Sequence, residues 1–336
     1  MTLKVAVAGA NGYAGITLVN LLLTHPEVEL TELSSRSLAG QELTRAFPLS
    51  GLHGTFVDKV DPRAAEVVFS CLPHNAAAAQ VAEWLEAGAR VIDLSADFRL
   101  KDPALYPRWY GREHPAPGLL AEAVLGLPEL HAAELRDARL IACPGCYSTA
   151  AILALAPAVA QGLITSDVVV DAKSGVSGAG RSLSLGTHYA EVQESVNAYS
   201  LGGHRHHPEV AQELGRVAAK GLPRVTFLTH LVPMVRGILA TCYFDADRSP
   251  TQVEAAYRDF YSGSTFTRVV PDTPRTKAVS LTNLCLVNVG CQGDKIIVTA
   301  ALDNLMKGAS GQAVECLNLA FGFGATTALA GPLSWP

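Results

Sequence analysis

Short apolar runs and helix-forming stretches alternate along the first 142 residues of the chain. This pattern predicts strands over residues 3–8, 28–33, 66–72, 90–94 and 140–142, and helices over residues 17–23 and 75–88. Such alternation is typical of a parallel, doubly wound sheet with right-handed crossovers. We therefore expect a Rossmann-type α/β domain at the beginning of the chain.

The pattern changes after residue 146, where strands begin to follow one another directly. An apolar helix is expected over residues 147–160, strands over 167–172, 224–231, 238–246, 284–291 and 295–302, and a closing helix over 308–321. The last two strands are separated by Gln292-Gly293-Asp294, which favours a hairpin. We expect a second, α+β domain with a mixed or antiparallel sheet that has one covered face.

The composition adds a preference for burial and excludes some partners. Of the 336 residues, 49% are hydrophobic and 17% charged, below the usual ~25%, which suits a large core plus surface buried between subunits. The net charge is −5 and no stretch concentrates the 26 basic residues, so nucleic acid and anionic membranes are not expected partners.

Nothing in the chain resembles a signal peptide or a membrane span. The longest apolar run, residues 150–160, contains Pro157 and falls short of the ~18 residues that a span needs. The 7 cysteines are odd in number and irregularly spaced, which favours free thiols in a reducing compartment. We expect a soluble cytoplasmic protein.

A glycine motif follows the first expected strand and precedes a helix. Its three glycines let backbone amides approach a pyrophosphate at a helix N-terminus, although such glycines also serve plain tight turns. The candidate cofactor-binding residues are Gly9, Asn11, Gly12, Tyr13, Ala14 and Gly15.

The end of the second strand discriminates between NAD and NADP. An NAD enzyme usually has an acidic residue there, whereas this chain has Ser34-Ser35-Arg36. Arg36 suits a 2′-phosphate but could also be a solvated loop charge. Glu32 is the competing residue, and a strand continuing to Leu33 would leave it inside the strand. NADP is favoured.

Cys146 is the candidate nucleophile. It lies where a strand gives way to an apolar helix, and a helix N-terminus stabilises a thiolate. The thiol could instead be a small buried hydrophobe, or Cys143-x-x-Cys146 could be a redox or metal pair.

Three further segments carry candidate chemistry. The segment 204–209 contains three histidines and a glutamate, which could supply a proton carrier, a metal site or only a surface cluster. The loop 173–181 offers amides, hydroxyls and a cation for an anion, or is simply flexible. Arg99 follows the strand ending at residue 94 and could clamp a carboxylate or pair with Asp97.

In combination these residues resemble the N-acetyl-γ-glutamyl-phosphate reductases of arginine biosynthesis, which belong to the aspartate-semialdehyde-dehydrogenase-like superfamily. The resemblance runs in order through Gly9–Gly15, Ser34–Arg36, Leu72–His74, Asp93–Arg99, Gly126–Leu130, Pro144–Tyr147, Ser174–Arg181, Gly203–His206, Arg236–Ile238 and Asp303–Gly308. It departs at Ser148 and at His207, where many members have proline and threonine, and the second departure leaves the choice of histidine less secure.

The resemblance implies an NADP-binding domain over residues 1–145, completed by a C-terminal helix 305–336, and a catalytic and oligomerisation domain over residues 146–304. It implies a dimer or tetramer without a metal. Cys146 and His204 then look like the catalytic pair. The implied substrate-binding residues are Arg99, Ser177, Gly178, Arg181, His206 and Glu209, and the implied cofactor-binding residues include Gly12, Ser34, Arg36, Pro73 and Asn304.

The function expected from these residues is reduction of a small acyl phosphate. Thiolate Cys146 attacks the carbonyl and expels phosphate, and the thioester is reduced by hydride from NADPH to the aldehyde with His204 supplying a proton. A lysine-biosynthesis reductase acting on a carrier-bound aminoadipyl phosphate is an alternative substrate assignment. A metal-dependent hydrolase and a non-catalytic NADP-binding sensor are alternatives of other classes.

Overall fold

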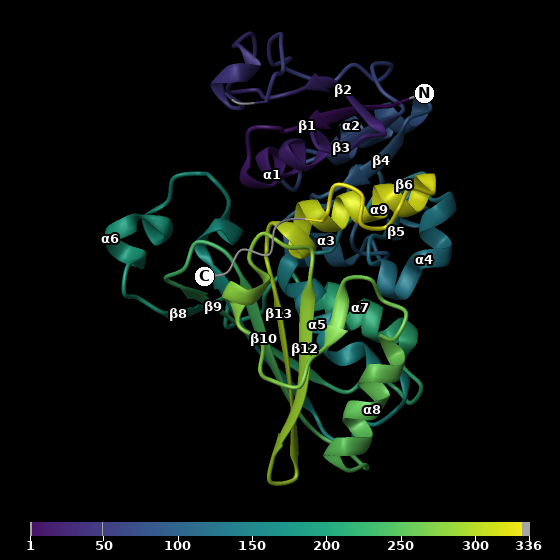
Figure 1. Ribbon diagram of the computed structural model, residues 1–336, viewed down its shortest axis with the longest axis vertical. Helices are drawn as coiled ribbons and strands as arrows, with labels where there is room; N and C mark the ends of the chain where they lie inside the picture. The colour runs from purple at the N-terminus through teal and green to yellow at the C-terminus, as the bar shows by residue number, and fades with distance from the viewer. Residues whose placement is uncertain (1, 49, 331–336) are drawn as a thin grey trace. The chain divides into compact units, whose positions relative to one another are not determined.

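The computed structural model describes residues 2–48 and 50–330 (Figure 1). The chain divides into two compact units. The first contains the residues up to Pro144 together with Ala309–Ala330, and the second is Gly145–Gly308. The predicted C-terminal segment 305–336 starts before this return to the first unit, and its last six residues lie outside the described part of the chain.

The first unit contains a six-stranded, entirely parallel sheet in the order β2-β1-β3-β4-β6-β5. Its strands are β1 (Leu3–Ala8), β2 (Val28–Leu33), β3 (Val67–Ser70), β4 (Arg90–Asp93), β5 (Val124–Leu125) and β6 (Leu140–Ala142). Its helices are α1 (Tyr13–Leu22), α2 (Ala78–Glu86), α3 (Leu105–Tyr110), α4 (Pro128–Asp137) and α9 (Gly311–Phe321). The predicted Rossmann-type sheet is confirmed.

The order of the strands reverses between β1 and β3, because the chain first adds β2 on one side of β1 and then β3 on the other. Ligands of open parallel sheets bind beyond the carboxyl ends of the strands at such a switch point. The glycine motif follows β1 and Pro73 follows β3, so both lie at this edge. The polypeptide from the other end of the chain completes the unit, since α9 packs against α1 and α4.

The second unit contains a seven-stranded mixed sheet in the order β11-β12-β13-β10-β7-β9-β8. Its strands are β7 (Val168–Gly175), β8 (Asn197–Tyr199), β9 (Val225–Val232), β10 (Ile238–Asp245), β11 (Thr267–Val269), β12 (Cys285–Gln292) and β13 (Lys295–Leu302). The helices are α5 (Cys146–Ala160), α6 (Tyr189–Val192), α7 (His207–Val217) and α8 (Pro250–Phe260). Only β7 with β9 and β11 with β12 pair in parallel, so the predicted mixed sheet is confirmed.

Helix α5 explains why one face of this sheet is buried over its central strands. Residues 147–159 are all buried, and the helix packs on β10 and β13 and against α7 and α8 (Figure 1). A helix that is apolar on every side, as this one is, requires protein contacts all round. The strand residues that face it are buried, whereas the alternate residues of β10 and β12 are half-exposed. The sheet therefore has one covered and one open face.

One predicted connection is present, and several other elements differ from the sequence prediction. The predicted hairpin is present, with Cys285 opposite Leu302 and Gln292 opposite Lys295 around a turn in which Gly293 has a φ of 58°. The end of the histidine-rich segment 204–209 belongs to a helix, because α7 begins at His207. The predicted closing helix begins as a π-helical turn (Met306–Ser310) before α9. The elements that we did not predict are α3, α4, α6, α7, α8, β5, β8 and β11.

In the described part of the chain, no helix combines the length and the apolar character that a bilayer crossing demands.

Candidate active site

Cys146 is the first residue of α5, and Gly145 caps that helix in an extended conformation. The Gly145 amide donates a hydrogen bond of 2.9 Å to Oε2 of Glu209, a fully buried carboxylate on α7. A Cβ atom on residue 145 would lie 2.3 Å from Nε2 of His206, so only glycine fits beside that imidazole. The helix N-terminus that carries the thiol is thus fixed by α7 and favours a thiolate through its dipole.

Two of the three histidines pack together beside this helix. His204 and His206 are each 7% exposed. Their rings pack edge to face, with the ring centroids 4.7 Å apart. The ring of Tyr147 lies edge-on to His204 at 5.4 Å, so the pair adjoins the residue that follows Cys146. His207 instead contacts Phe227.

The hydrogen bonding of His204 defines its chemical form. Burial, with a further contribution from the charge of Arg205, lowers the pKa of His204 to about 4, so the ring is neutral near pH 7. Its Nδ1 accepts a hydrogen bond of 3.1 Å from the backbone amide of His206. A neutral imidazole that accepts at one nitrogen carries its hydrogen on the other. The Nε2 of His204 is therefore a hydrogen-bond donor.

Two tyrosines complete the aromatic surroundings of His204. The Tyr199 hydroxyl donates to the Tyr147 hydroxyl at 3.2 Å, and Tyr147 donates to the His230 carbonyl at 2.8 Å. Burial raises the pKa of both phenols above the usual range, so both remain protonated. Sequence reasoning missed Tyr199, which comes from the short strand β8 and has no motif around it.

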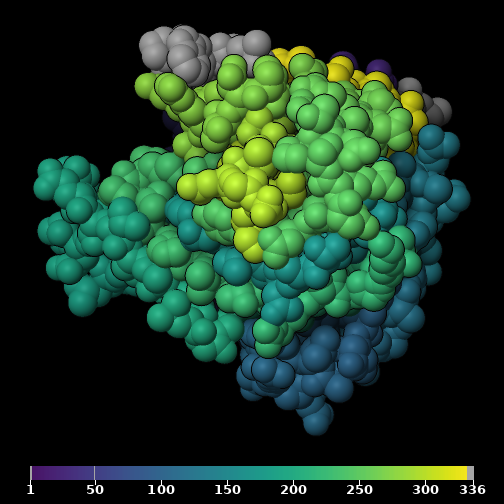
Figure 2. Space-filling view, turned by 90° about the horizontal axis from the view of Figure 1, so that it is seen from below, coloured from purple at the N-terminus to yellow at the C-terminus, as the bar shows by residue number. Residues whose placement is uncertain are grey.

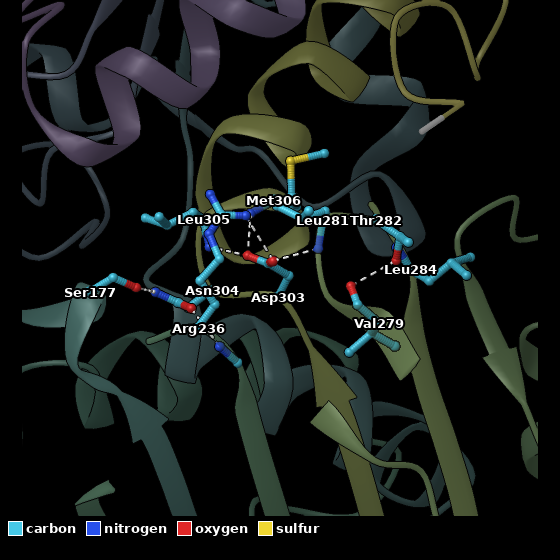
Figure 3. Close-up of polar contacts among 11 residues, drawn as sticks. Ser177, Arg236, Val279, Leu281, Thr282, Leu284, Asp303, Asn304, Leu305 and Met306 are labelled. Carbon is cyan, nitrogen blue, oxygen red and sulfur yellow. Dashed lines mark hydrogen bonds and ion pairs between the residues drawn. The ribbon is translucent and has the colours of Figure 1, made fainter. Parts of the chain in front are cut away.

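The loop 303–308 also lies close to the candidate nucleophile. A Cβ atom on Gly308 would lie 2.8 Å from the Cβ of Cys146. Asn304 accepts a hydrogen bond of 2.8 Å from the Gly237 amide and donates one of 2.9 Å to the Ser177 hydroxyl (Figure 3). The structure thus links a predicted cofactor residue, Asn304, directly to a predicted substrate residue.

The remaining substrate candidates are placed differently. Gly178 and Arg181 are exposed on the loop that follows β7, after the buried Ser177. Glu209 holds the Gly145 amide, so its contact in the structure is with the helix start. Arg99 lies in the first unit, where its Nη2 donates to the Leu94 carbonyl at 2.8 Å. Its binding of a carboxylate stays a prediction.

Cys143 differs from Cys146 in its surroundings. It is 1% exposed in the first unit, and its amide donates to the Asp93 carbonyl at 2.8 Å. All seven cysteines are free thiols. Among residues 2–48 and 50–330, no group of three or more His, Cys, Asp or Glu side chains is arranged to hold a metal.

Each glycine of the motif has a different structural role. Gly9 has a φ of 78°, and a Cβ there would lie 2.7 Å from the Cys71 carbonyl. A Cβ on Gly15 would lie 2.4 Å from the Gly9 carbonyl. Gly12 caps α1, and a Cβ there would meet only the Gly9 carbonyl, at 3.7 Å. The motif therefore packs tightly inside and stays open outward at the start of α1, which fits a dinucleotide pyrophosphate.

Of the residues after β2, Ser34 supports the glycine loop and Arg36 is exposed to solvent. The Ser34 carbonyl accepts hydrogen bonds from Gly9 and Ala10, and its side chain is 3% exposed, so Ser34 holds the glycine loop. Arg36 is exposed, and Asn11 beside it donates to Ser37 at 2.9 Å. Glu32 lies within β2 and accepts a hydrogen bond from the Asp61 amide at 2.9 Å.

Asp97 fixes the segment that follows Pro73. Its carboxylate accepts hydrogen bonds from the amides of Asn75, Ala77 and Ala78 at 2.6, 3.1 and 3.1 Å. Asn75 has a φ of 69°, which a non-glycine residue rarely adopts. The carboxylate therefore holds this turn at the start of α2, beside the switch point.

Family models match both units. Residues 4–138 match the semialdehyde dehydrogenase NAD-binding domain, and residues 146–304 match the semialdehyde dehydrogenase dimerisation domain. Among solved structures, aspartate semialdehyde dehydrogenase II complexed with ASA from Vibrio cholerae superposes with a TM-score of 0.73 at 18% identity, covering 96% of this chain and 99% of that one. Aspartate semialdehyde dehydrogenase with NADP from Candida albicans superposes with a TM-score of 0.72 at 18% identity, covering 95% and 98%.

Sequence relatives are much closer than these structures. A protein of Dehalococcoides mccartyi is 47% identical, with 97% of each chain covered, and one of Desulforudis audaxviator is 48% identical, with 99% of this chain and 100% of the relative covered. Both are N-acetyl-γ-glutamyl-phosphate reductases. Likeness at 18% identity shows the fold alone, but identity near one half over almost the full length of both chains goes further: the chain belongs to the N-acetyl-γ-glutamyl-phosphate reductase family.

Proposed function

We propose that this protein reduces N-acetyl-γ-glutamyl phosphate with NADPH to N-acetylglutamate semialdehyde and phosphate, in arginine biosynthesis. The observation that carries the proposal is the cysteine at the start of α5, fixed by Glu209 and flanked by two buried histidines. The names of the relatives, 44–48% identical over nearly the whole chain, supply the substrate. We place the reaction in the cytoplasm, where all seven thiols stay reduced.

The chain supplies nucleophile and electrostatic support. The Cys146 thiolate forms a C–S bond to the acyl carbon, and the C–O bond to phosphate breaks, with a proton ending on the phosphate. The glycine loop would hold the nicotinamide cofactor, which would supply the hydride that reduces the thioester. His204 donates a hydrogen bond from its Nε2–H to the substrate oxygen as negative charge develops there. The C=O bond then re-forms as the C–S bond breaks, which releases the aldehyde and the Cys146 thiolate.

The test of this proposal is turnover of defined substrates. Free acetylglutamyl phosphate, free aspartyl phosphate and carrier-bound aminoadipyl phosphate are compared by NADPH oxidation. We expect the highest kcat/KM for the free acetylglutamyl compound. A methylene more or less changes binding by only ~1–3 kcal/mol, so weak turnover of a homologue is compatible with the proposal. A clear preference for the carrier-bound substrate would overturn it.

NADP is our choice over NAD because of Arg36. This exposed guanidinium follows β2 at the carboxyl edge of the sheet, and the competing Glu32 already binds the Asp61 amide. A similar fold, that of the Candida albicans dehydrogenase, is described with NADP.

Arg36→Ala therefore weakens the binding of NADPH far more than the binding of NADH. A charge-assisted hydrogen bond to the 2′-phosphate is worth about 1.5–3 kcal/mol, so the KM for NADPH rises ~10–100-fold while that for NADH hardly changes. The matched control is Arg63→Ala, an exposed arginine before β3 and hence at the opposite edge of the sheet. An unchanged ratio of the two KM values would make Arg36 a solvated loop charge.

The open face of the seven-stranded sheet is the surface that we propose for a second copy of the chain. Six of the residues on it are large, apolar and only half-buried, namely Val169, Leu228, Leu239, Tyr243, Leu286 and Ile297. Helix α5 covers the other face. The matched dimerisation-domain model supports a homo-oligomer, a dimer or tetramer, built through this unit.

Tyr243→Glu consequently shifts the protein to monomers. Tyr243 lies on β10 near the middle of the open face, and an interface cannot bury a carboxylate there without a partner. Light scattering after size exclusion measures the mass. Leu222→Glu is the control, since Leu222 is 38% exposed and lies before β9. An oligomer that survives Tyr243→Glu would move the interface elsewhere, for example to the exposed segment 183–201 in the teal lobe of Figure 2.

A further inference from the structure

Asp303 lies at the end of β13 and is fully buried. Its Oδ1 accepts hydrogen bonds from the amides of Leu305 and Met306 at 2.8 and 3.1 Å (Figure 3). Its Oδ2 accepts from the Leu281 amide at 2.7 Å and from Nη1 of Arg236 at 2.9 Å. Four donors fill the hydrogen-bonding capacity of the two oxygens. The carboxylate thus joins three separate segments of the second unit.

The backbone around Asp303 extends this connection to Cys146. The Asp303 carbonyl accepts hydrogen bonds from the amides of Met306 and Gly308 at 3.2 and 3.0 Å. The same Gly308 leaves no room for a Cβ, because Cys146 Cβ would be 2.8 Å away and the Asp303 carbonyl 3.2 Å away. The turn 303–308 therefore packs on the nucleophile from a position that Asp303 sets.

A second branch reaches the Asn304–Ser177 pair. Arg236, which binds Asp303, precedes Gly237, whose amide donates to Asn304. The segment 234–237 also holds the start of the Ser177 loop, since Val176 and Ser177 donate to the carbonyls of Met234 and Val235 at 2.9 and 3.1 Å. Leu281 takes a left-handed φ of 62°, which its hydrogen bond to Asp303 helps to maintain.

We propose that Asp303 is a positioning residue that sets both Cys146 and the Asn304–Ser177 pair through the turn 303–308 and the segment 234–237. The proposal rests on the reductase function proposed above. Asp303 touches neither substrate nor cofactor in this role. Misplacement of reacting groups by about 1 Å can cost ~10²-fold in rate, so its effect is expected in kcat rather than in KM.

Asp303→Asn tests this directly. The amide keeps one acceptor oxygen and turns its NH₂ toward one of the two donor pairs. We expect kcat to fall ~10²-fold with both KM values little changed. In the free enzyme, the rate of iodoacetamide alkylation at Cys146 rises relative to that at the exposed Cys291, measured by mass spectrometry of both peptides. This second readout needs no substrate, so it separates failure of the positioning role from failure of the proposed reaction.

Thr282→Val is the matched control. The Thr282 hydroxyl is buried in the same 279–284 turn, donates to the Val279 carbonyl at 2.9 Å and accepts from the Leu284 amide at 3.3 Å (Figure 3). Its loss removes these two hydrogen bonds within the turn but none of the four hydrogen bonds to the Asp303 carboxylate. We expect lowered thermal stability with unchanged kcat and an unchanged alkylation ratio. Equal losses of kcat in both variants would make Asp303 merely structural.

Arg236→Gln provides a second route if Asp303→Asn does not fold. Arg236 is at the partly exposed end of the network, 19% exposed, and glutamine can still donate one hydrogen bond. We expect kcat and the alkylation ratio to change in the same direction as in Asp303→Asn. A folded Arg236→Gln protein with wild-type kcat and alkylation would overturn the proposal. An Arg236→Gln protein in which only the KM for the acyl phosphate rises would also overturn the proposal, because Arg236 would then bind substrate.

Discussion

Replacing Cys146 with serine removes essentially all reductase turnover, by about 10⁴-fold or more, while NADPH still binds. A serine hydroxyl is not ionised at neutral pH, so the helix N-terminus of α5 has no anion to stabilise. Loss of NADPH absorbance gives the rate, and fluorescence titration with NADPH gives the cofactor affinity.

Cys143→Ser is the matched control for this experiment. Cys143 is 1% exposed, lies three residues earlier in the same Cys-Pro-Gly-Cys sequence and belongs to the first unit. We expect the control to keep most of its activity, with some loss of stability from the buried hydroxyl. If both substitutions abolished turnover equally in folded protein, a mechanism that uses a pair of cysteines would have to replace ours.

His204→Asn reduces kcat by ~10²–10³-fold, the range for loss of a single hydrogen-bond donor to a developing oxyanion. The asparagine amide cannot place its hydrogen where Nε2 of the imidazole lies. His206→Asn is the companion variant, and we expect it to act more through KM, because the His206 ring packs on Gly145. The opposite ranking of the two variants would show that His206 is the catalytic imidazole.

The pH profile tests the same residue from another direction. The pKa of His204 is lowered to about 4, so its neutral form dominates above that pH and is lost only as the pH falls through about 4. Between pH 5 and 8 the wild-type kcat should therefore show no acid limb that belongs to His204. A limb near the ordinary histidine pKa of ~6.5 that disappears in His204→Asn would contradict the neutral-donor role.

Local patterns in the sequence predicted much of the fold. The bounds predicted for residues 3–8, 28–33, 140–142 and 295–302 coincide with β1, β2, β6 and β13. The strand β2 alternates apolar and polar residues, and the other three are mostly apolar. Helix α8 was missed although Ser249 and Gln252 form a capping box around Pro250, a signal that the sequence contains. Helix α7 was missed because the histidine-rich segment 204–207 has no apolar periodicity, although Pro208 at the helix start is a signal that the sequence contains.

Site residues could be predicted from the sequence only where a local motif indicates their role. Cys146 follows from its place at the start of an apolar helix. The contact between Glu209 and the Gly145 amide joins residues 64 positions apart, and no pattern indicates it. The same is true of Asp303 and Arg236, which are 67 positions apart. Pairs of this kind depend on how strands and helices pack, which the periodicity of a single segment does not encode.

The division of the chain affects how the protein folds during synthesis. The second unit is one continuous segment, whereas the first needs α9, whose residues 311–318 are all buried and which packs on α1 and α4. Domains generally fold as units while the chain is being made. The second unit can thus fold on the ribosome before the first is complete. Until α9 emerges, apolar surface on α1 and α4 stays exposed, so the nascent chain is vulnerable to aggregation at that stage and a truncation before α9 would leave it so permanently.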